Sequence, residues 1–486
     1  MKTMKRILAA ALALFMLVAM AACGNGNSPA TTPATTPATT PATVPGTEPQ
    51  YDPNDPFAKA ELPDIDMDGY VFDVADGTAS QLSGIEETGT KWDSTRYYML
   101  RSLEEDLNCE FNFFVSGTDV YAQAQPVLQA GDKYADYIGH SIWVLGHFVQ
   151  NGYAIPFDDV PHVDMEKDYW YDSSIELSTI NGKTYVLTGD MLPNIEFPWV
   201  LIYNKSMIAD LGLTDPVQLV KDNTWTIDKF LEYCKKATRD NGDNVWNFDD
   251  TYGWGSARGD VDHMFYVGMG GQVVEKDANG KWKLVVNSQQ SQAALGYADE
   301  IASYTYDLSD GHSWVDFVWD MFPAGRMMFL PYMPNVLKTA TYQDITFDFG
   351  ILPAPKLNEQ QEDYHVYHCH NSQGLLVMRG ANVEYTGYVL EAQAAFNQHT
   401  VMPEMKQLYR ELYLRDDEDN AAMLQLINES GRFQGVLSLL NQVNYGLFPA
   451  GTMLVTNVMV NGYDFSTAYE ETAELTEIAL DEVLKQ

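Results

Sequence analysis

Hydrophobic and polar side chains alternate over residues 69–76 (GYVFDVAD), a period typical of a strand with one buried face. Residues 94–115 (STRYYMLRSLEEDLNCEFNFFV) predict an amphipathic helix followed by a second strand, with Ser94 as the helix N-cap. Residues 122–141 predict another helix and another strand. Strand, helix and strand in this order indicate a parallel α/β sheet, in which ligands bind at the carboxyl ends of the strands. Residues 139–143 (GHSIW) are therefore predicted to lie at the mouth of a binding site.

The first 22 residues have the pattern of a signal peptide. Three basic residues precede the apolar run at residues 7–20, which is too short to form a permanent membrane-spanning helix. Two alanines then lead to Cys23, and this junction resembles a bacterial lipobox. In a lipobox the cysteine is lipidated and becomes the new N-terminus. The alternative is an ordinary secretory signal that is cut nearby, so that Cys23 is removed with it.

A threonine- and proline-rich segment comes next and extends to residue 58. Its ATTP repeats block helix and sheet and favour extended polyproline II. At roughly 3.1 Å per residue, such a tether would reach on the order of 80 Å. We expect it to hold the folded body near the outer face of the cell membrane but away from the bilayer surface.

Composition limits what the folded body can be. The chain has 486 residues, so the body after the tether is long enough for two domains or one large two-lobed unit. The net charge of −39 is unfavourable for binding nucleic acid. Cys109, Cys234 and Cys369 form no CxxC pair, so we expect three small buried side chains, although one disulfide bridge remains open.

Five segments, in the expected order, resemble extracellular solute-binding proteins of ABC importers, in the carbohydrate-type group. They are WVLIYNKSMIADLGL with NTWTIDKFLEYCKKAT (199–238), TYGWGS with FYVGMGGQVV (251–274), FPAGRMMFLPYMPNV (322–336), FDFGILPAPKLNEQQEDY (347–364) and YLRDDEDNAAMLQLINESGRFQ (413–434).

The resemblance implies an α/β protein with the type 2 periplasmic-binding-protein fold, in which two lobes are joined by crossover strands around a ligand cleft. It implies a monomer without cofactor or catalysis that captures a solute, most simply an oligosaccharide, and delivers it to a membrane permease. The expected organisation is a signal peptide (1–22), a lipidated Cys23 with its tether (23–58), lobe one (59–200 and 346–400) and lobe two (201–345 and 401–486).

A saccharide site needs aromatic plates for the C–H faces of the sugar and polar groups for its hydroxyls. The chain has 10 Trp and 29 Tyr. The place of each ring in the sequence must therefore be used to separate rings that could stack on a sugar from rings of the core. Candidates are the side chains that come after predicted strands or match the segments above: Trp92, His140, Trp143, Asp190, Trp254, Arg258 and Tyr332. Trp225 opens a helix beside the first crossover and is predicted to be a packing residue.

Two stretches have a superficial likeness to metal sites. Residues 64–69 (DIDMDG) begin like a calcium loop, but the twelfth position is Ala75 instead of Glu. Residues 365–370 (HVYHCH) would place their histidines on opposite faces of a strand, which splits a zinc ligand set. We therefore predict no metal centre, while a bound calcium ion remains open.

Two other functions compete with solute transport. A secreted glycan-active enzyme would need a carboxylate pair, but 68 acidic residues make any chosen pair arbitrary. The G-x-S-x-G and H-E-x-x-H motifs are absent from the sequence. A surface glycan-binding lipoprotein without a transport role would use the tether equally well, but it does not account for the ordered segments. The identity of the solute is not fixed by the sequence.

Overall fold

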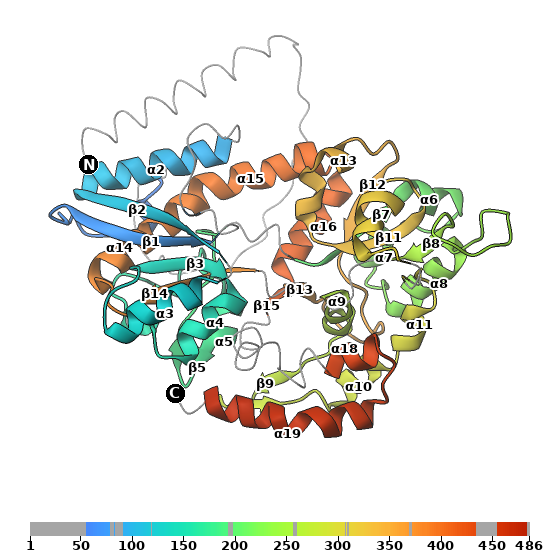
Figure 1. The fold of residues 1–486 in the computed structure, drawn as a ribbon. Helices are drawn as coiled ribbons and strands as arrows, with labels where there is room; N and C mark the ends of the chain where they lie inside the picture. Colours follow the sequence, from blue (N-terminus) through green and yellow to red (C-terminus); the bar gives the residue numbers. More distant parts are fainter. Residues whose placement is uncertain are drawn as a thin grey trace, which may run out of the picture.

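The computed structural model describes residues 55–77, 82, 91–117, 119–192, 198–255, 260–306, 308, 311–368, 372–433 and 454–483. The predicted signal peptide, Cys23 and most of the tether lie outside these residues. Two α/β lobes stand side by side, with the first sheet at the left of Figure 1 and the second at the right. Within the described part of the chain, every helix is too short or too polar to cross a lipid bilayer.

The lobe-one sheet has the strand order β2-β1-β3-β14-β4. Strand β1 pairs in parallel with both β2 and β3, which confirms the predicted parallel arrangement, whereas β14 runs antiparallel to β3 and β4. The bounds are β1 (Tyr70–Gly77), β2 (Cys109–Ser116), β3 (Tyr137–Ser141), β4 (Ala154–Ile155) and β14 (Gln373–Met378).

Helices cover both faces of this sheet, and neighbouring residues of its central strands therefore enter different cores. Tyr137 and Leu375 pack with α2 and α14, while Ile138 and Leu376 pack with α3 and α4. Burial on both faces explains why β14 (QGLLVM) is an unbroken buried run. The helices of the lobe are α2 (Lys91–Leu107), α3 (Val120–Ala130), α4 (Ile142–Gln150), η2 (Phe157–Asp159), α5 (Asp172–Ser178) and α14 (Val383–Phe396), with the small hairpin β5 (Thr179–Ile180) and β6 (Lys183–Thr184).

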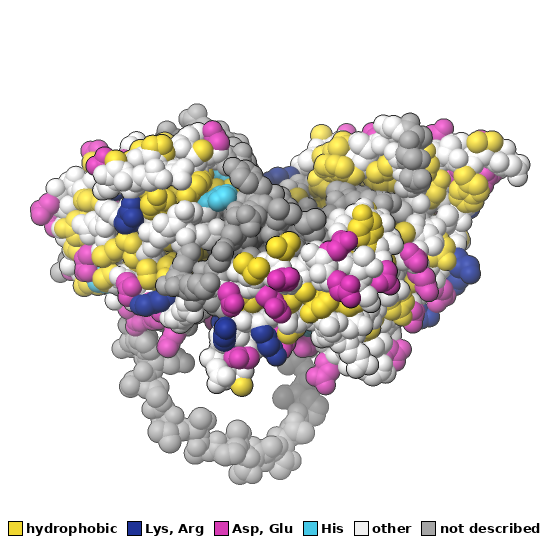
Figure 2. Space-filling view, turned by 60° about the horizontal axis from the view of Figure 1, so that its bottom comes forward, with side chains coloured by type: hydrophobic (Ala, Val, Ile, Leu, Met, Phe, Trp, Pro, Cys, Tyr) yellow, Lys and Arg dark blue, Asp and Glu magenta, His cyan; other side chains and the backbone are white. Residues whose placement is uncertain are grey.

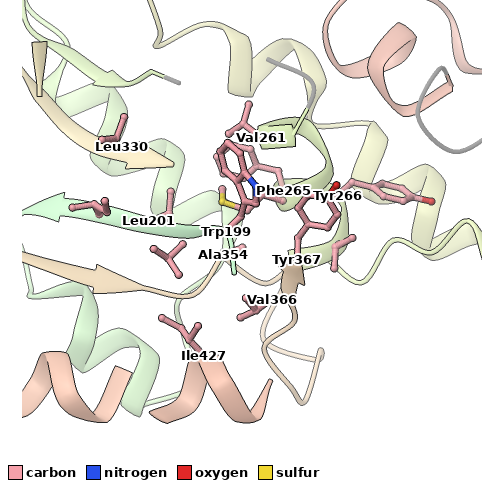
Figure 3. Packing of buried hydrophobic residues seen from close by; sticks show 14 of the residues in the cluster. Trp199, Leu201, Val261, Phe265, Tyr266, Leu330, Ala354, Val366, Tyr367 and Ile427 are labelled. Carbon is pink, nitrogen blue, oxygen red and sulfur yellow. The ribbon is translucent and has the colours of Figure 1, made fainter. Parts of the chain in front are cut away.

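The lobe-two sheet has the order β12-β7-β11-β8. Its strands are β7 (Val200–Asn204), β8 (Tyr252–Trp254), β11 (Met327–Tyr332) and β12 (Phe349–Leu352). Figure 3 shows Leu201 and Leu330 on neighbouring strands of this sheet and Trp199 beside Val261 and Phe265. Trp225 is fully buried against the sheet and its indole Nε1 donates to the Pro353 carbonyl (3.2 Å), which confirms its predicted packing role.

The other elements surround the second sheet or link it to the first. They are α6 (Lys205–Asp210), α7 (Pro216–Lys221), α8 (Ile227–Ala237), α9 (Asp260–Gly268), β9 (Val274–Lys276), β10 (Trp282–Leu284), α10 (Gln289–Leu295), α11 (Ala298–Ala302), α12 (Trp314–Asp316), η5 (Phe317–Met321), η6 (Pro334–Lys338), α13 (Ala340–Gln343), η7 (Asn397–Val401), α15 (Met402–Leu408), η8 (Tyr409–Tyr413), α16 (Glu418–Glu429), α18 (Leu454–Met459) and α19 (Phe465–Val483).

The chain passes between the lobes at the centre of the molecule. There Pro198 forms a bridge with His368, and the Trp199 backbone N–H donates to the Tyr367 carbonyl (2.8 Å). Strand β13 (Val366–His368) also pairs with β15 (Gly431–Phe433). Since β12 pairs with β7 in lobe two, the chain returns to lobe one later than the predicted boundary at residue 346.

The first described residues form an arm fixed to lobe one. Helix η1 (Ala58–Ala60) lies against α14, and the Phe57 and Phe396 rings are 5.0 Å apart. The Tyr388 hydroxyl donates to the Pro63 carbonyl (2.7 Å), and Lys59 forms an ion pair with Asp168. The chain thus enters the folded body on lobe one.

Candidate ligand cleft

The described parts of the two lobes stand at the left and right of Figure 2. On the lobe-one side, β1 and β3 end together because they run in parallel. Gly77 ends β1, and a Cβ there would lie 2.9 Å from both the Gly139 carbonyl oxygen and the His140 ring. Glycine therefore allows the His140 ring to sit against the end of β1.

His140 is nearly buried, and its Nδ1 accepts the backbone N–H of Ser141 (2.8 Å). Burial lowers the pKa of His140, with Asp76 acting in the opposite direction. The imidazole is therefore neutral at pH 7 and offers hydrogen bonding without a charge. Trp143, in the first turn of α4, is half-buried against the hydrophobic core.

The lobe-two side carries a series of three aromatic rings. Trp199 precedes β7 and Tyr332 ends β11, and these positions adjoin because Tyr332 pairs with Val200. The Trp199 and Tyr332 rings lie edge to face at 5.7 Å. The Trp314 ring lies nearly parallel to Tyr332 at 6.3 Å and is 40% exposed. The series runs from a buried ring to one open to solvent.

Trp199 brings a polar group to this position. Its ring is 2% exposed, and its Nε1–H is buried without a hydrogen-bond acceptor among the described residues. A buried donor without an acceptor costs about 1–3 kcal/mol, so native proteins rarely keep one without a use. The pairing of Tyr332 with Val200 brings this donor to the end of the lobe-two sheet.

Both sets of residues lie where the lobes meet. Ser141 pairs with Gln373, the first residue of β14 after the second crossover, and Val200 is the first residue of β7 after the first crossover. The crossover ends of the two sheets therefore carry His140, Trp143, Trp199 and Tyr332.

Asp190 is buried, and the Tyr171 hydroxyl donates to its carboxylate (2.8 Å). Burial raises the pKa of Asp190, with that hydrogen bond opposing the shift. Trp254 is 4% exposed and its Nε1 donates to the Ile301 carbonyl (2.8 Å), an environment that favours packing. Arg258 and the side chain of Trp92 lie outside the described residues. Ligand contact by each predicted residue remains a prediction.

Sequence reasoning missed Trp199 and Trp314. Trp199 is the first residue of the 199–238 segment, and Trp314 interrupts a polar stretch (SDGHSWVD). A large aromatic side chain in a polar stretch was an available signal for Trp314, because packing alone seldom explains one. Trp199 offered no comparable signal, since its ring is as buried as that of a core residue.

Within the described ranges, no cluster of three or more His, Cys, Asp or Glu side chains is arranged to hold a metal ion. In the calcium-like stretch, the Asp66 carboxylate accepts hydrogen bonds from Asn108 and the Asp68 backbone, which lowers its pKa. In the histidine-rich stretch, burial lowers the pKa of His368 to about 3, while Cys369 and His370 lie outside the described residues.

Two of the three cysteines predicted to be small buried side chains are described. Cys109 and Cys234 are both buried free thiols, as predicted, whereas Cys369 lies outside the described residues. Burial raises the pKa of Cys109 to about 12.

Two α/β lobes, joined by crossing segments and carrying aromatic and polar side chains at their junction, define a two-lobed solute-binding protein. Residues 102–382, more than half of the chain, match the family described as bacterial extracellular solute-binding protein, and the chain belongs to that family. The predicted family, fold class and solute-binding role are confirmed.

Solved structures with the same fold cover most of the chain. An ABC substrate-binding protein from Listeria monocytogenes, in complex with cycloalternan, has a TM-score of 0.52 and 14% identity over 86% of this chain and 99% of its own. The GacH receptor of Streptomyces glaucescens, solved unliganded and with acarbose, has a TM-score of 0.55 and 16% identity over 85% and 99%.

UgpB from Mycobacterium tuberculosis, in complex with glycerophosphocholine, has a TM-score of 0.54 and 16% identity over 84% of this chain and 98% of its own. A comparison with curated proteins gives no match.

Proposed function

We propose that this protein captures a saccharide at the junction of its lobes and delivers it to an ABC transporter permease, without catalysing a reaction. The aromatic series Trp199–Tyr332–Trp314 carries the proposal. Tyr332 and Trp314 are nearly parallel, and their rings have flat apolar faces that match the C–H faces of sugar rings. The oligosaccharide ligands of the Listeria and Streptomyces proteins support this choice.

Polar groups at the same junction suit sugar hydroxyls. His140 is neutral at pH 7, and the Trp199 Nε1–H is a buried donor without an acceptor among the described residues. Neither carries a charge, so they favour a neutral polyhydroxylated ligand over an anion or a cation. Trp143 and Tyr332, both half-buried, would contribute one apolar face from each lobe.

The place of action is inferred from the N-terminal sequence. We propose that Cys23 carries a lipid, and that the Thr/Pro-rich tether keeps the body at the outer face of the cell membrane. A tethered receptor stays at a high effective concentration near its permease. The protein would work as a monomer, because each chain contains both walls of the cleft.

The experiment is a calorimetric titration of the mature Cys23→Ser chain with acarbose, maltotetraose and cycloalternan. Trp314→Ala and Tyr332→Ala should each weaken saccharide binding by about tenfold, equivalent to about 1.4 kcal/mol. Trp225→Ala serves as the matched control, because it removes a core ring of the same lobe and should lower stability first.

Two outcomes would contradict the proposal. One is binding of a saccharide with an affinity that neither cleft substitution changes. The other is the absence of binding to all three saccharides together with binding of glycerophosphocholine, which would move the ligand to another chemical class.

A further inference from the structure

The hairpin β9–β10 belongs to lobe two but reaches lobe one. Its turn is fixed by Asp277, whose carboxylate accepts the backbone N–H groups of Asn279 and Lys281 (2.8 and 3.0 Å). Helix α19 packs along β10 and also against α18, which packs against α9. The hairpin therefore moves with lobe two. Figure 1 shows it below the centre of the molecule, beside β5 of lobe one.

Two side chains of the hairpin donate to backbone carbonyls of lobe one. The Trp282 Nε1–H donates to the Thr179 carbonyl (3.1 Å), and the Lys276 ammonium donates to the Glu176 carbonyl (2.6 Å). The same ammonium lies 4.9 Å from the centre of the Trp282 ring. The two donors thus form one unit, in which a cation over the indole face holds both groups in place.

The acceptors lie at the C-terminal end of α5. The last carbonyls of a helix have no intrahelical partners, and the helix dipole places partial negative charge there. An ammonium and an indole N–H are suitable donors for such an end. Burial lowers the pKa of Lys276, opposed by the charge of Glu176, which indicates that the ammonium is partly withdrawn from water.

Helix α5 is firmly part of lobe one. The Ser178 hydroxyl donates to the Val186 carbonyl (2.6 Å), and the Tyr171 backbone N–H donates to the Thr188 carbonyl (3.0 Å). Leu187, between those acceptors, bridges to Leu375 of the lobe-one sheet. A bond to the end of α5 therefore connects lobe two directly to the lobe-one sheet, at a distance in sequence from every crossover segment.

We propose that Lys276 and Trp282 are positioning residues that latch the lobes together and set how far the cleft opens. Their role in ligand capture rests on the proposed function, but the contact between the lobes does not. Breaking the latch should shift the ligand-free protein toward wider separations of the lobes. A ligand that needs both walls would then bind more weakly, because part of its binding energy is used to close the lobes.

The test measures the separation of the lobes without any ligand. Spin labels on Tyr98→Cys in α2 and Lys235→Cys in α8, both exposed, report the distance between lobes by double electron–electron resonance. The background is the mature chain with Cys23→Ser and Cys369→Ser. Cys109 and Cys234 stay in place, because burial raises their pKa and suppresses the reactive thiolate.

Lys276→Met keeps the apolar stem over Trp282 and removes the ammonium, and Trp282→Phe removes the N–H donor. Each should add a longer-distance population or lengthen the mean distance. Lys283→Met is the control, because Lys283 pairs with Glu275 (2.8 Å) within the same hairpin. Melting temperatures identify a variant that fails to fold, and Lys276→Met then decides the result alone.

Unchanged distance distributions in Lys276→Met and Trp282→Phe would overturn the latch, as would an equal change in Lys283→Met. The proposed function fails independently, if the titrations give either of the two contradicting outcomes stated above. Because the label distances need no ligand, the two failures can be distinguished.

Discussion

At the scale of single residues, Glu391 gives the clearest pH dependence. It is fully buried on α14, where the Tyr169 hydroxyl and the Trp170 Nε1–H (3.0 Å) donate to its two oxygens. Burial raises the pKa of Glu391 from 4.5 to about 7, with these hydrogen bonds opposing the shift. Between pH 4.5 and 7 the folded protein therefore keeps a proton that the unfolded chain releases.

The free energy of unfolding should consequently fall as pH rises through this window, by up to about 1.4 kcal/mol per pH unit. The contribution is complete below pH 4.5 and lost above about pH 7. Urea denaturation of Glu391→Gln across this range should show a shallower slope than the unsubstituted protein. Glu429→Gln, on an exposed residue, should keep the original slope. Equal slopes in all three proteins would show that Glu391 does not titrate in this window.

Residue identity alone could not separate exposed rings from core rings. Trp225 and Trp254 have their indole N–H groups bonded to backbone carbonyls and are both buried, whereas Trp314 is 40% exposed. All three are tryptophans in segments of mixed polarity. Whether each ring is buried depends on packing against residues that are distant in the sequence, and a local sequence pattern does not show this. The position of His140 and Trp143 at the end of β3 was easier to predict, because the end of a parallel strand can be read from hydrophobic periodicity.

At the scale of elements, α14 approaches the 156–163 segment unusually closely. A Cβ on Gly387 would lie 1.8 Å from the Pro161 carbonyl oxygen, so the helix and the backbone of that segment are in direct contact. Gly387→Ala should therefore lower the free energy of unfolding by about 3 kcal/mol despite the better helix propensity of alanine. Urea denaturation monitored by circular dichroism measures this change.

The matched control is Gly296→Ala at the end of α10. There the nearest atom to a new Cβ is a carbonyl oxygen at 3.3 Å and the backbone φ is −62°. We expect an effect within about 1 kcal/mol. A Gly387→Ala protein as stable as the control would mean that α14 can move away from Pro161 at little cost.

Helices and strands could be predicted where one hydrophobic period, that of a helix or that of a strand, dominates the segment. The alternating and amphipathic patterns placed β1, α2, β2, α3 and β3 in the correct order and direction. The antiparallel entry of β14 and the pairing of β12 with β7 could not be predicted, because strand partners are chosen across long stretches of chain. The contact between the β9–β10 hairpin and the end of α5 could not be predicted either, since its donors and acceptors are separated by a hundred residues or more.

At the scale of the whole molecule, attachment to the membrane should depend on Cys23. Cys23→Ser should release the protein to the medium or leave it unprocessed, while the described body, which begins at Asp55, keeps its melting temperature. Membrane fractionation of expressing cells measures this. Cys109→Ser is the control, because Cys109 is buried within lobe one. Undiminished membrane association of Cys23→Ser would rule out the lipid anchor.

Force applied through the tether would act first on lobe one. The arm around η1 is bound to α14 through Phe57 and Pro63, and to Asp168 of lobe one through Lys59. Force that enters at Asp55 therefore passes into lobe one before it reaches any crossing segment. If Cys23 anchors the chain as proposed, thermal motion of the body relative to the membrane would turn the whole molecule without separating its lobes.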